Sequence, residues 1–431
     1  MTKRAEGQRG KQGEKAAPAP NASLEQVLLP MVAGLVTTRQ DLMTWVHRRG
    51  LDALDEVFRF DAEALAGPKG KHREQRTHHH WGRTRTELPF GGQRIVVERP
   101  RVRSTDGCEA TLPAVETFRK LDPLPERVVE RILLGVSTRG YSRSVEAPPE
   151  EVPRRGTSKS AASRHLVERT RRKLRADFAR RLDDVDLVAL MIDGIEVAQQ
   201  TLGVALGITT TGEKLPLGLE QGSTENATLC TLLLNGLIAR GLRLTERTLC
   251  IIDGGKGVRK ALGDVFGELA VVQRCQVHKR RNVRDLLSPA HTAYAMSTMN
   301  DAYKSASADT ARKRLRQLIS WLEANGEDAA ASSLREGLEE TLTVLKLRLP
   351  PTLRRSLSTT NAIENVNGTI RRVTRNVKRW RGRDMRRRWV GLAISDAATR
   401  FRRIKGHRDL PLLLRALRQQ NAALDAKQEA A

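Results

Sequence analysis

The sequence is poor in aromatic residues and cysteine, and it has no long apolar stretch. Phe, Trp and Tyr make up only 3% of the 431 residues, so we expect an aliphatic core. The four cysteines, at positions 108, 230, 250 and 275, include no Cys-x-x-Cys pair, which argues against a disulfide framework and favours a reducing compartment. No run of about 18 apolar residues occurs, and the N-terminus lacks the apolar segment of a signal peptide. We therefore expect a cytoplasmic protein without a membrane span.

Positive charge is what the sequence has in excess. Lys and Arg number 76 against 50 Asp and Glu, which gives a formal net charge of +26. Each phosphate that Lys or Arg neutralises releases a counterion, so clustered charge of this size favours nucleic-acid binding. The alternative is a merely soluble basic protein, or one whose GC-rich genome favours Arg codons. We expect double-stranded DNA as the partner and a location at the nucleoid.

The first part of the chain divides into a tail and a longer region. Residues 1–22 predict a disordered basic tail, because Gly, Lys, Ala and Pro occur there without apolar periodicity. Residues 23–180 predict a mainly helical, DNA-binding region, with helical spacing from Leu24 to Leu65 and one strand in "RIVVERPRVRS". The histidines at 78–80 lack partners at ligand spacing and are interpreted as a polar loop.

A helix-turn-helix is expected at about residues 124–177. "GTSKSAASRHLVERTRRKL" begins with Ser and Thr caps and continues as an amphipathic helix. Lys159, Ser163 and Arg164 lead this helix, and such residues suit contact with base edges and phosphates. An ordinary solvated helix pair is the alternative.

Short apolar runs begin after residue 183. "VDLVALMIDGI", "TLGVALGITT" and "KLPLGLEQG" predict three strands, the last two joined by the hairpin turn "TTTGEK". A helix, the strand "RTLCIIDGG", a second helix and the strand "ELAVVQRC" follow. Three meander strands and then helix, strand, helix and strand predict a mixed α/β sheet over residues 183–278. Residues 279–355 read as helical throughout.

Two of these strands end in the same way, in an aspartate followed by glycine. Asp193 ends "LVALMID" and Asp253 ends "TLCIID". A buried strand-ending carboxylate needs a partner or a cation, and the adjacent glycine lets a ligand approach closely. If the strands are neighbours, the two carboxylates repel each other until a divalent metal relieves the repulsion. The alternative is that each Asp-Gly step is an ordinary turn or cap.

Glu364 is the candidate for a third acid. It lies in the first turn of a helix that we expect to start near Asn361, and Thr and Asn residues surround it. An acid there can simply complement the helix dipole, but that role does not require polar companions. Three carboxylates prefer Mg²⁺ or Mn²⁺, and two ions about 4 Å apart would clamp the attacking and leaving oxygens of a phosphodiester.

Together the motifs resemble the Mutator-like family of bacterial insertion-sequence transposases. The resemblance covers roughly residues 24–407 and rests on "MIDGI", "IIDGGKGVRKAL", "RCQVHKRRNV", "NAIENVNGTIRRVTRNVKRW" and "RFRRIKG", with "LPAVETFRKLDPLPERVVERILLGVSTRGYSR" and "SKSAASRHLVERT" upstream. It implies an RNase H-like core with a DDE triad of Asp193, Asp253 and Glu364. It also implies that 279–355 is an α-helical insertion between core parts 183–278 and 356–407, with a C-terminal helix or tail at 408–431.

Two further features take their meaning from this resemblance. "CQVH" matches a Cys-x-x-His feature of the family, Cys275 and His278. One such pair has too few ligands for structural zinc, so we favour a site-organising or DNA-positioning role over metal binding. The cations after Glu364 recur at helical spacing and predict a phosphate-tracking stripe on one helix. These are Arg371, Arg372, Arg375, Lys378 and Arg379. Trp380 could stack on an unpaired base or belong to the core.

The implied function is that of a transposase. It would bind terminal inverted repeats and target DNA, as a homodimer or higher oligomer, and perform two-metal strand cleavage and transfer. One alternative is a DNA-binding regulator or an inactive domesticated relative, against which the intact acid triad argues. A second is another RNase H-like nuclease such as a resolvase, against which the N-terminal helices and the helical insertion argue.

Overall fold

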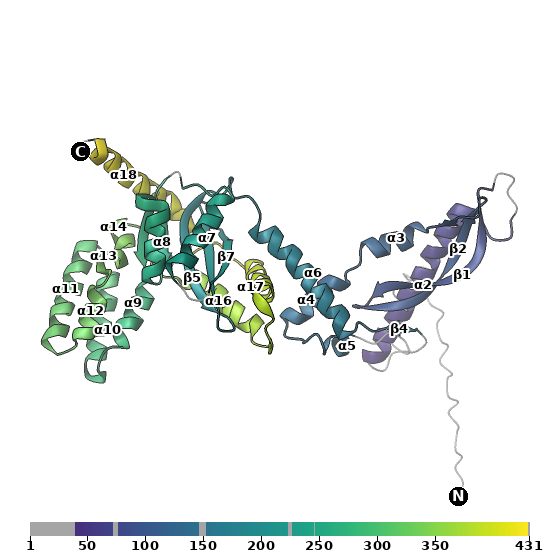
Figure 1. The fold of residues 1–431 in the computed structure, drawn as a ribbon, viewed down its shortest axis with the longest axis horizontal. Coiled ribbons are helices and arrows are strands. Elements are labelled where there is room, and N and C mark those ends of the chain that lie inside the picture. Colours follow the sequence, from purple (N-terminus) through teal and green to yellow (C-terminus); the bar gives the residue numbers. More distant parts are fainter. Residues whose placement is uncertain (1–38, 72–75, 146–151, 223–225, 245, 430–431) are drawn as a thin grey trace, which may run out of the picture. The chain divides into compact units, whose positions relative to one another are not determined.

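The computed structural model describes residues 39–71, 76–145, 152–222, 226–244 and 246–429, which form two compact units (Figure 1). Unit 1 comprises residues 1–124 and 145–157, and unit 2 comprises residues 125–144 and 158–431. The expected basic tail at 1–22 lies outside the described residues. Unit 2 includes helical segments from the region that the sequence analysis assigned to residues 23–180.

Unit 1 combines a four-stranded antiparallel sheet with two helices, so its described residues contain more strands than the one that the sequence predicted. The strands are β1 (His78–Phe90), β2 (Gln93–Ser104), β3 (Glu109–Ala110) and β4 (Arg154–Arg155), and the helices are α2 (Arg39–Ala66) and α3 (Pro113–Lys120). The predicted strand is β2. Its partner β1 is rich in Arg and Thr, and only part of one face of this strand is apolar. The sequence pattern therefore did not predict β1.

The histidines at 78–80 therefore form the start of a strand and not a polar loop. β1 and β2 are joined by Gly91 and Gly92, both at positive φ, which is the geometry of a tight two-residue hairpin turn. Leu88 and Val102 of this hairpin pack with Phe58 of α2 in a small core. The sheet and α2 thus stabilise each other through one apolar layer.

Unit 2 contains the mixed sheet that the sequence predicted. Its strand order is β7-β6-β5-β8-β9, in which β5, β6 and β7 are antiparallel and β8 and β9 run parallel to β5. The strands are β5 (Leu187–Glu196), β6 (Thr201–Thr209), β7 (Lys214–Gly222), β8 (Thr248–Ile252) and β9 (Ala270–Arg274). The expected mixed α/β class is confirmed for this unit.

Alternate residues of the central strands face two different apolar layers. Leu190 and Ile192 of β5 belong to the layer that α7 (Ala227–Ala239) and α8 (Lys256–Phe266) cover. Ala189 and Met191 belong to the opposite layer, which also contains residues of α16 (Asn361–Thr374), α17 (Gly382–Ala398) and α18 (Leu410–Glu429) (Figure 1). Because side chains alternate along a strand, the residue after Ile192 continues the α16 side of the sheet.

Residues 279–355 are helical, as predicted, and have an apolar core of their own. The helices from the end of β9 onward are α9 (Gln276–Arg284), α10 (Pro289–Lys304), α11 (Ala308–Ala324), α12 (Asp328–Arg335), α13 (Leu338–Thr341), α14 (Thr343–Lys346) and α15 (Pro351–Leu357). This helical segment separates β9 from the last part of the unit in sequence.

Helices also occur where the helix-turn-helix was expected. They are α4 (Leu124–Leu133), α5 (Tyr141–Ser144) and α6 (Lys159–Phe178). The Ser158 side chain caps α6 by accepting from the amide of Ala161, as the sequence indicated. Residues 145–158 separate α5 from α6, a longer interval than the short turn of that motif. In unit 2, α6 packs against α17, so it forms part of the same compact body as the mixed sheet.

Three helices complete unit 2: α16 (Asn361–Thr374), α17 (Gly382–Ala398) and α18 (Leu410–Glu429). α16 begins at Asn361, as predicted, and buries an apolar stripe at helical spacing on the sheet. The expected C-terminal helix is α18, and it buries Leu410, Leu413 and Leu417 in the core of the same chain. No helix of the described residues is both long and apolar enough to cross a membrane.

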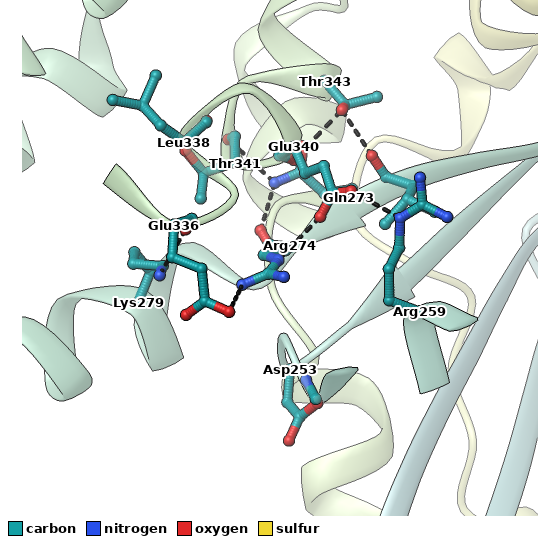
Figure 2. Close-up of polar contacts among 12 residues, drawn as sticks. Asp253, Arg259, Gln273, Arg274, Lys279, Glu336, Leu338, Glu340, Thr341 and Thr343 are labelled. Atoms are coloured by element: carbon teal, nitrogen blue, oxygen red, sulfur yellow. Dashed lines mark hydrogen bonds and ion pairs between the residues drawn. The ribbon is translucent and has the colours of Figure 1, made fainter. Parts of the chain in front are cut away.

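A polar network docks the helical segment onto β9 (Figure 2). The buried side chain of Gln273 makes two contacts. Its Nε2 donates to the backbone carbonyl of Thr341 at 3.0 Å, and its Oε1 accepts from the backbone N–H of Val344 at 2.9 Å. Lys279 donates to the carbonyls of Ser333 and Glu336 at the C-terminal end of α12. A cation is favourable there because the helix dipole makes this end partly negative. The end of the helical segment is therefore fixed to the strand that neighbours β8.

Arg274 is the centre of this network. Its guanidinium pairs with Glu340 at 2.8 Å, and Glu340 also pairs with Arg259 of α8 at 2.6 Å (Figure 2). A Cβ at Gly337 would lie 2.4 Å from the Nε atom of Arg274, and Gly337 has φ of 62°. Both facts require glycine at this position.

We expect Gly337→Ala to lower the free energy of unfolding more than Gly326→Ala. Gly326 also has positive φ, but a Cβ added there would meet no atom within 4 Å, so its change costs only backbone strain of about 1 kcal/mol. At Gly337 the new methyl group must also displace Arg274 from Glu340, which adds about 1–2 kcal/mol. Denaturant unfolding of both variants measures the difference, and equal losses would contradict the packing described here.

Candidate active site

The two candidate aspartates lie side by side on neighbouring parallel strands. Only Asp253 follows the end of its strand, whereas β5 continues past Asp193 to Glu196, so the expectation that Asp193 ends a strand is wrong. Ile192 of β5 pairs in register with Ile252 of β8, so Asp193 and Asp253 occupy the next position on each strand. Adjacent strands are about 4.8 Å apart. Both carboxylates are half-buried at the carboxyl end of the sheet. The condition set in the sequence analysis, that the two strands are neighbours, is therefore met.

Local structure holds each aspartate differently. Asp253 is followed by Gly254, at φ of 114°, and its Oδ1 accepts from the amide of Gly255 at 2.9 Å. The side chain of Arg274 runs past Gly254, and the Asp253 carboxylate points away from that guanidinium (Figure 2). Asp193 accepts a 2.8 Å hydrogen bond from Nδ2 of Asn367 on α16. Arg274 and its partners thus occupy one side of the Asp253 turn and leave the other side for the carboxylate.

Glu364 lies on the same face of α16 as Asn367, one turn earlier. Residues three apart on a helix are neighbours, so the contact of Asn367 with Asp193 turns Glu364 toward the sheet edge. The Oε1 of Glu364 accepts from the Thr360 hydroxyl at 3.0 Å and lies 3.4 Å from Nδ1 of His278. The carboxylate is therefore held by side chains from α9 and from the residue before α16, and does not merely complement the helix dipole.

Cys275 and His278 connect β9 to this glutamate. The Cys275 thiol is buried, and its sulphur accepts from the amides of His278 at 3.5 Å and Thr360 at 3.4 Å. Burial raises the pKa of the thiol, but hydrogen bonds from His278 and Thr360 outweigh it, so the pKa is lowered overall. Hydrogen bonding to Cys275 is the largest cause that raises the pKa of His278, and the charges of Glu364 and Asp253 add to it against burial.

His278 therefore lies within the electrostatic reach of two of the three predicted acids. Asp253 and Glu364 both favour its protonated form. Asn367, one turn after Glu364 on α16, donates to Asp193. The fold thus places α16, which carries Glu364, against the edge of the sheet where Asp193 and Asp253 lie.

Two sets of residues at this edge offer metal ligands. Cys275, His278 and Glu364 have ligand atoms within 4.8 Å of one another, whereas the three acids do not form so tight a group among the described residues. The thiol and imidazole of the first set already make protein hydrogen bonds, which fits a positioning role. The acids present hard oxygen ligands. Oδ1 of Asn367, buried beside Asp193 without a hydrogen-bond partner, is a further oxygen that a cation would satisfy. The residues present therefore fit a hard divalent cation.

Sequence reasoning did not assign an orienting role to Thr360, Asn367 or Arg274. These residues lie in or beside the motifs quoted above, but their contacts join segments that are 66 to 174 positions apart. Asn367 left one signal, because it lies three residues after Glu364 on an expected helix. A polar residue at that spacing, on a face otherwise occupied by Ile and Val, indicates a shared site.

The basic stripe is not on one helix, which corrects the sequence analysis. Arg371 and Arg372 belong to α16, but the helix ends at Thr374 and Arg375 is its C-cap. Lys378 and Arg379 lie in the non-helical stretch before α17. Asn and Val at positions 376 and 377 are weak helix formers, and the Thr374 hydroxyl bonds to the carbonyl of Ile370, which favours the end of the helix.

Several residues expected to contact DNA instead line one cavity of unit 2, of about 600 Å³. Lys159, Ser163 and Arg164 come from the start of α6, and Arg379 comes from the stretch between α16 and α17. Arg372 is turned elsewhere and pairs with Asp396 at 3.0 Å. Trp380 packs partly against the core. The fold thus gathers cations from two distant segments of the sequence.

Comparison with known proteins gives one consistent result. The Mutator family of transposases matches residues 58–403. The chain is 27% identical over 298 residues to the transposase for insertion sequence element IS905 of Lactococcus lactis subsp. lactis (strain IL1403), covering 67% of this chain and 71% of that protein. It is 29% identical over 371 residues to the transposase for insertion sequence element ISRM5 of Rhizobium meliloti (strain 1021), covering 82% and 85%.

A third relative is the transposase for insertion sequence element IS256 in transposon Tn4001 of Staphylococcus aureus. It is 26% identical over 311 residues, which cover 70% of this chain and 76% of that protein. The family match includes β5, β8 and α16, which carry the three acids. The chain belongs to the Mutator family of transposases.

Proposed function

We propose that this protein is the transposase of a bacterial insertion sequence and that Asp193, Asp253 and Glu364 are its catalytic residues. One observation carries the proposal: acids from two neighbouring strands and a distant helix meet at one sheet edge, linked through Asn367 and His278. A purely structural role for the three acids would not bring them together at the end of the sheet.

The strand arrangement supports an RNase H-like core. Three antiparallel strands are followed by two that run parallel to the first, and the order is β7-β6-β5-β8-β9. The all-helical segment between β9 and α16 accounts for the sequence distance between Asp253 and Glu364. Family membership supports the same arrangement, with its DDE triad, by analogy.

The reaction is a pair of phosphodiester exchanges. In the first, water attacks the phosphorus at an element end, a new P–O bond forms, and the bond to the 3′-oxygen breaks. That oxygen takes a proton and becomes the free 3′-hydroxyl. In the second, this hydroxyl attacks a phosphodiester of target DNA and displaces the target's 3′-oxygen. No covalent bond to the protein is required.

The residues of the chain bind, orient and balance charge for these steps. Asp193, Asp253 and Glu364 would hold two divalent ions, Mg²⁺ or Mn²⁺, which supply activation of the nucleophile and stabilisation of the leaving oxygen. Asn367 orients Asp193, while Thr360 and His278 orient Glu364. Basic residues hold the polyanion over these acids, and double-stranded DNA of the terminal inverted repeats and the target would be the partner. Assembly as a homodimer or higher oligomer belongs to the same proposal.

We expect Asp193→Asn, Asp253→Asn and Glu364→Gln each to lower strand cleavage by about 100-fold or more, because each removes a charged metal ligand. DNA binding without metal should persist. The measurement is cleavage of a labelled element end in Mg²⁺, beside a binding assay in EDTA. Cleavage at the wild-type rate in any one variant would remove that residue from the triad.

Asn367→Ala tests a positioning residue. Loss of its hydrogen bond to Asp193 should raise the metal concentration that gives half-maximal cleavage by about 10–100-fold. Asn365→Ala, an exposed change on the same helix, is the matched control and should leave the metal dependence unchanged. A variant that is equally impaired at every metal concentration would indicate a merely structural role for Asn367.

The basic cavity yields a prediction about DNA binding. If Arg164 and Arg379 contact phosphates, changing both to Ala should weaken binding to all sequences similarly and reduce the salt slope of log K by about 2. Arg316→Ala, on the exposed surface of α11, is the control. Binding measured across a salt series checks the expectation, and an unchanged slope would exclude this cavity from the phosphate-binding surface.

A further inference from the structure

A second basic cavity lies beside the candidate active site, between α9, α10 and α15. Its volume is about 280 Å³. Four cationic side chains line it, and the lining contains no carboxylate. They are Arg280, Lys304, Arg354 and Arg355.

The absence of acids sets the cavity apart from the parts of the helical segment where arginines pair with carboxylates. Arg312 pairs with Glu339, for example, and Arg335 pairs with Glu323. None of the four cavity cations takes part in an ion pair among the residues that the structure describes. Like charges gathered in one concavity repel one another, and an anion in the cavity would relieve that repulsion.

Two of the four cations are held in place by the protein. Arg280 donates to the side chain of Asn300, and Arg354 donates to the carbonyl of Ser305 at 3.2 Å. Both are half-buried, so their orientation is part of the fold. Lys304 and Arg355 are exposed at the same cavity and make it accessible to a charged ligand.

The cavity shares a wall with the residues that position Glu364. Ser358 and Thr359 line it and directly precede Thr360, whose hydroxyl bonds to Glu364. Gln276 directly follows Cys275 and also lines the cavity. Its backbone N–H donates to the carbonyl of Ser358 at 3.0 Å. An anion bound there would be a near neighbour of the phosphate at the carboxylates.

We propose that this cavity binds a phosphodiester group of an unpaired DNA strand, next to the phosphate at the three acids. The cavity is far too small for a duplex, and a basic groove that follows one backbone is how proteins hold single strands. Arginine provides paired donors that match phosphate oxygens. The inference rests on the proposed function, because it takes the DNA strand at Glu364 as its source of phosphate.

The test uses the full-length chain in EDTA, so that it does not depend on cleavage. Binding is measured for two labelled element-end duplexes, one blunt and one with a single-stranded extension. Lys304→Ala/Arg355→Ala is the test variant, because neither side chain anchors the fold through a contact to Asn300 or Ser305. Lys313→Ala, an exposed cation of α11, is the control.

We expect the double variant to lose about tenfold in affinity for the extended duplex and to lose about 1–2 from its salt slope. Blunt-duplex binding and the control should match the wild type. Replacing the extension's phosphates with uncharged methylphosphonates should weaken wild-type binding by a similar factor and leave the double variant unaffected.

Equal losses on blunt and extended DNA would overturn the proposal and reduce the cavity to general surface charge. Methylphosphonates that weaken the variant as much as the wild type would overturn it too, because the phosphate contact would then lie elsewhere. Failure of strand cleavage in the wild type would contradict the proposed function alone, since the binding comparison requires no metal.

Discussion

The mutual repulsion of Asp193 and Asp253 is the constraint around which unit 2 is organised. Their strands are parallel neighbours paired in register up to Ile192 and Ile252, so the two side chains start from adjacent backbone positions. Ionised groups this close and half-buried need donors, cations or both. Gly255 donates to Asp253 and Asn367 donates to Asp193, and in the proposed reaction a divalent cation would add to these contacts. The buried apolar residues of β5 and β8 thus stabilise the sheet, and the two carboxylates that follow them supply the charge of the candidate site.

The helical segment serves that edge by carrying α16 to it. Gln273, Arg274 and Lys279 fix the segment to β9 and α9 through its backbone carbonyls and Glu340, so its end is placed by polar contacts rather than by a loop. Cys275 then joins β9 to Thr360, one step before α16 begins. Motion of the segment would therefore change the orientation of Glu364. The cavity between α9, α10 and α15 borders the contact between Cys275 and Thr360. For this reason we propose that it holds part of the DNA strand whose phosphate lies at the acids.

The central strands and the two aspartates were predictable because their signal is local. A run such as "LVALMID" is apolar for the length of a strand and then stops at a charged residue next to glycine. Glu364 was predictable from its polar neighbours and from the resemblance together. β1 was not, because Arg and Thr alternate along its middle and even the buried position 86 is a threonine, so the apolar alternation of a strand is missing. The end of α16 was also missed, since a regular spacing of Arg and Lys imitates a helical stripe.

The contacts that orient the acids could not have been predicted, because they are tertiary. The hydrogen bond from Asn367 to Asp193 spans 174 positions, and that from Thr360 to Cys275 spans 85. Nothing in either local sequence specifies the partner. The cavity that gathers Arg164 and Arg379 is equally a product of α6 packing beside α17. Sequence patterns thus indicated the candidate acids, while the fold determined which side chains contact them.

The most direct test of the central claim is a change of metal specificity at Asp253. In Asp253→Cys a soft thiolate replaces a hard carboxylate, and Mg²⁺ accepts such a ligand far less readily than Mn²⁺ does. If this side chain holds the catalytic metal, cleavage of a labelled element end should be lost in Mg²⁺ and return in Mn²⁺. Cleavage at the wild-type rate in Mg²⁺ would contradict the claim that Asp253 is a metal ligand.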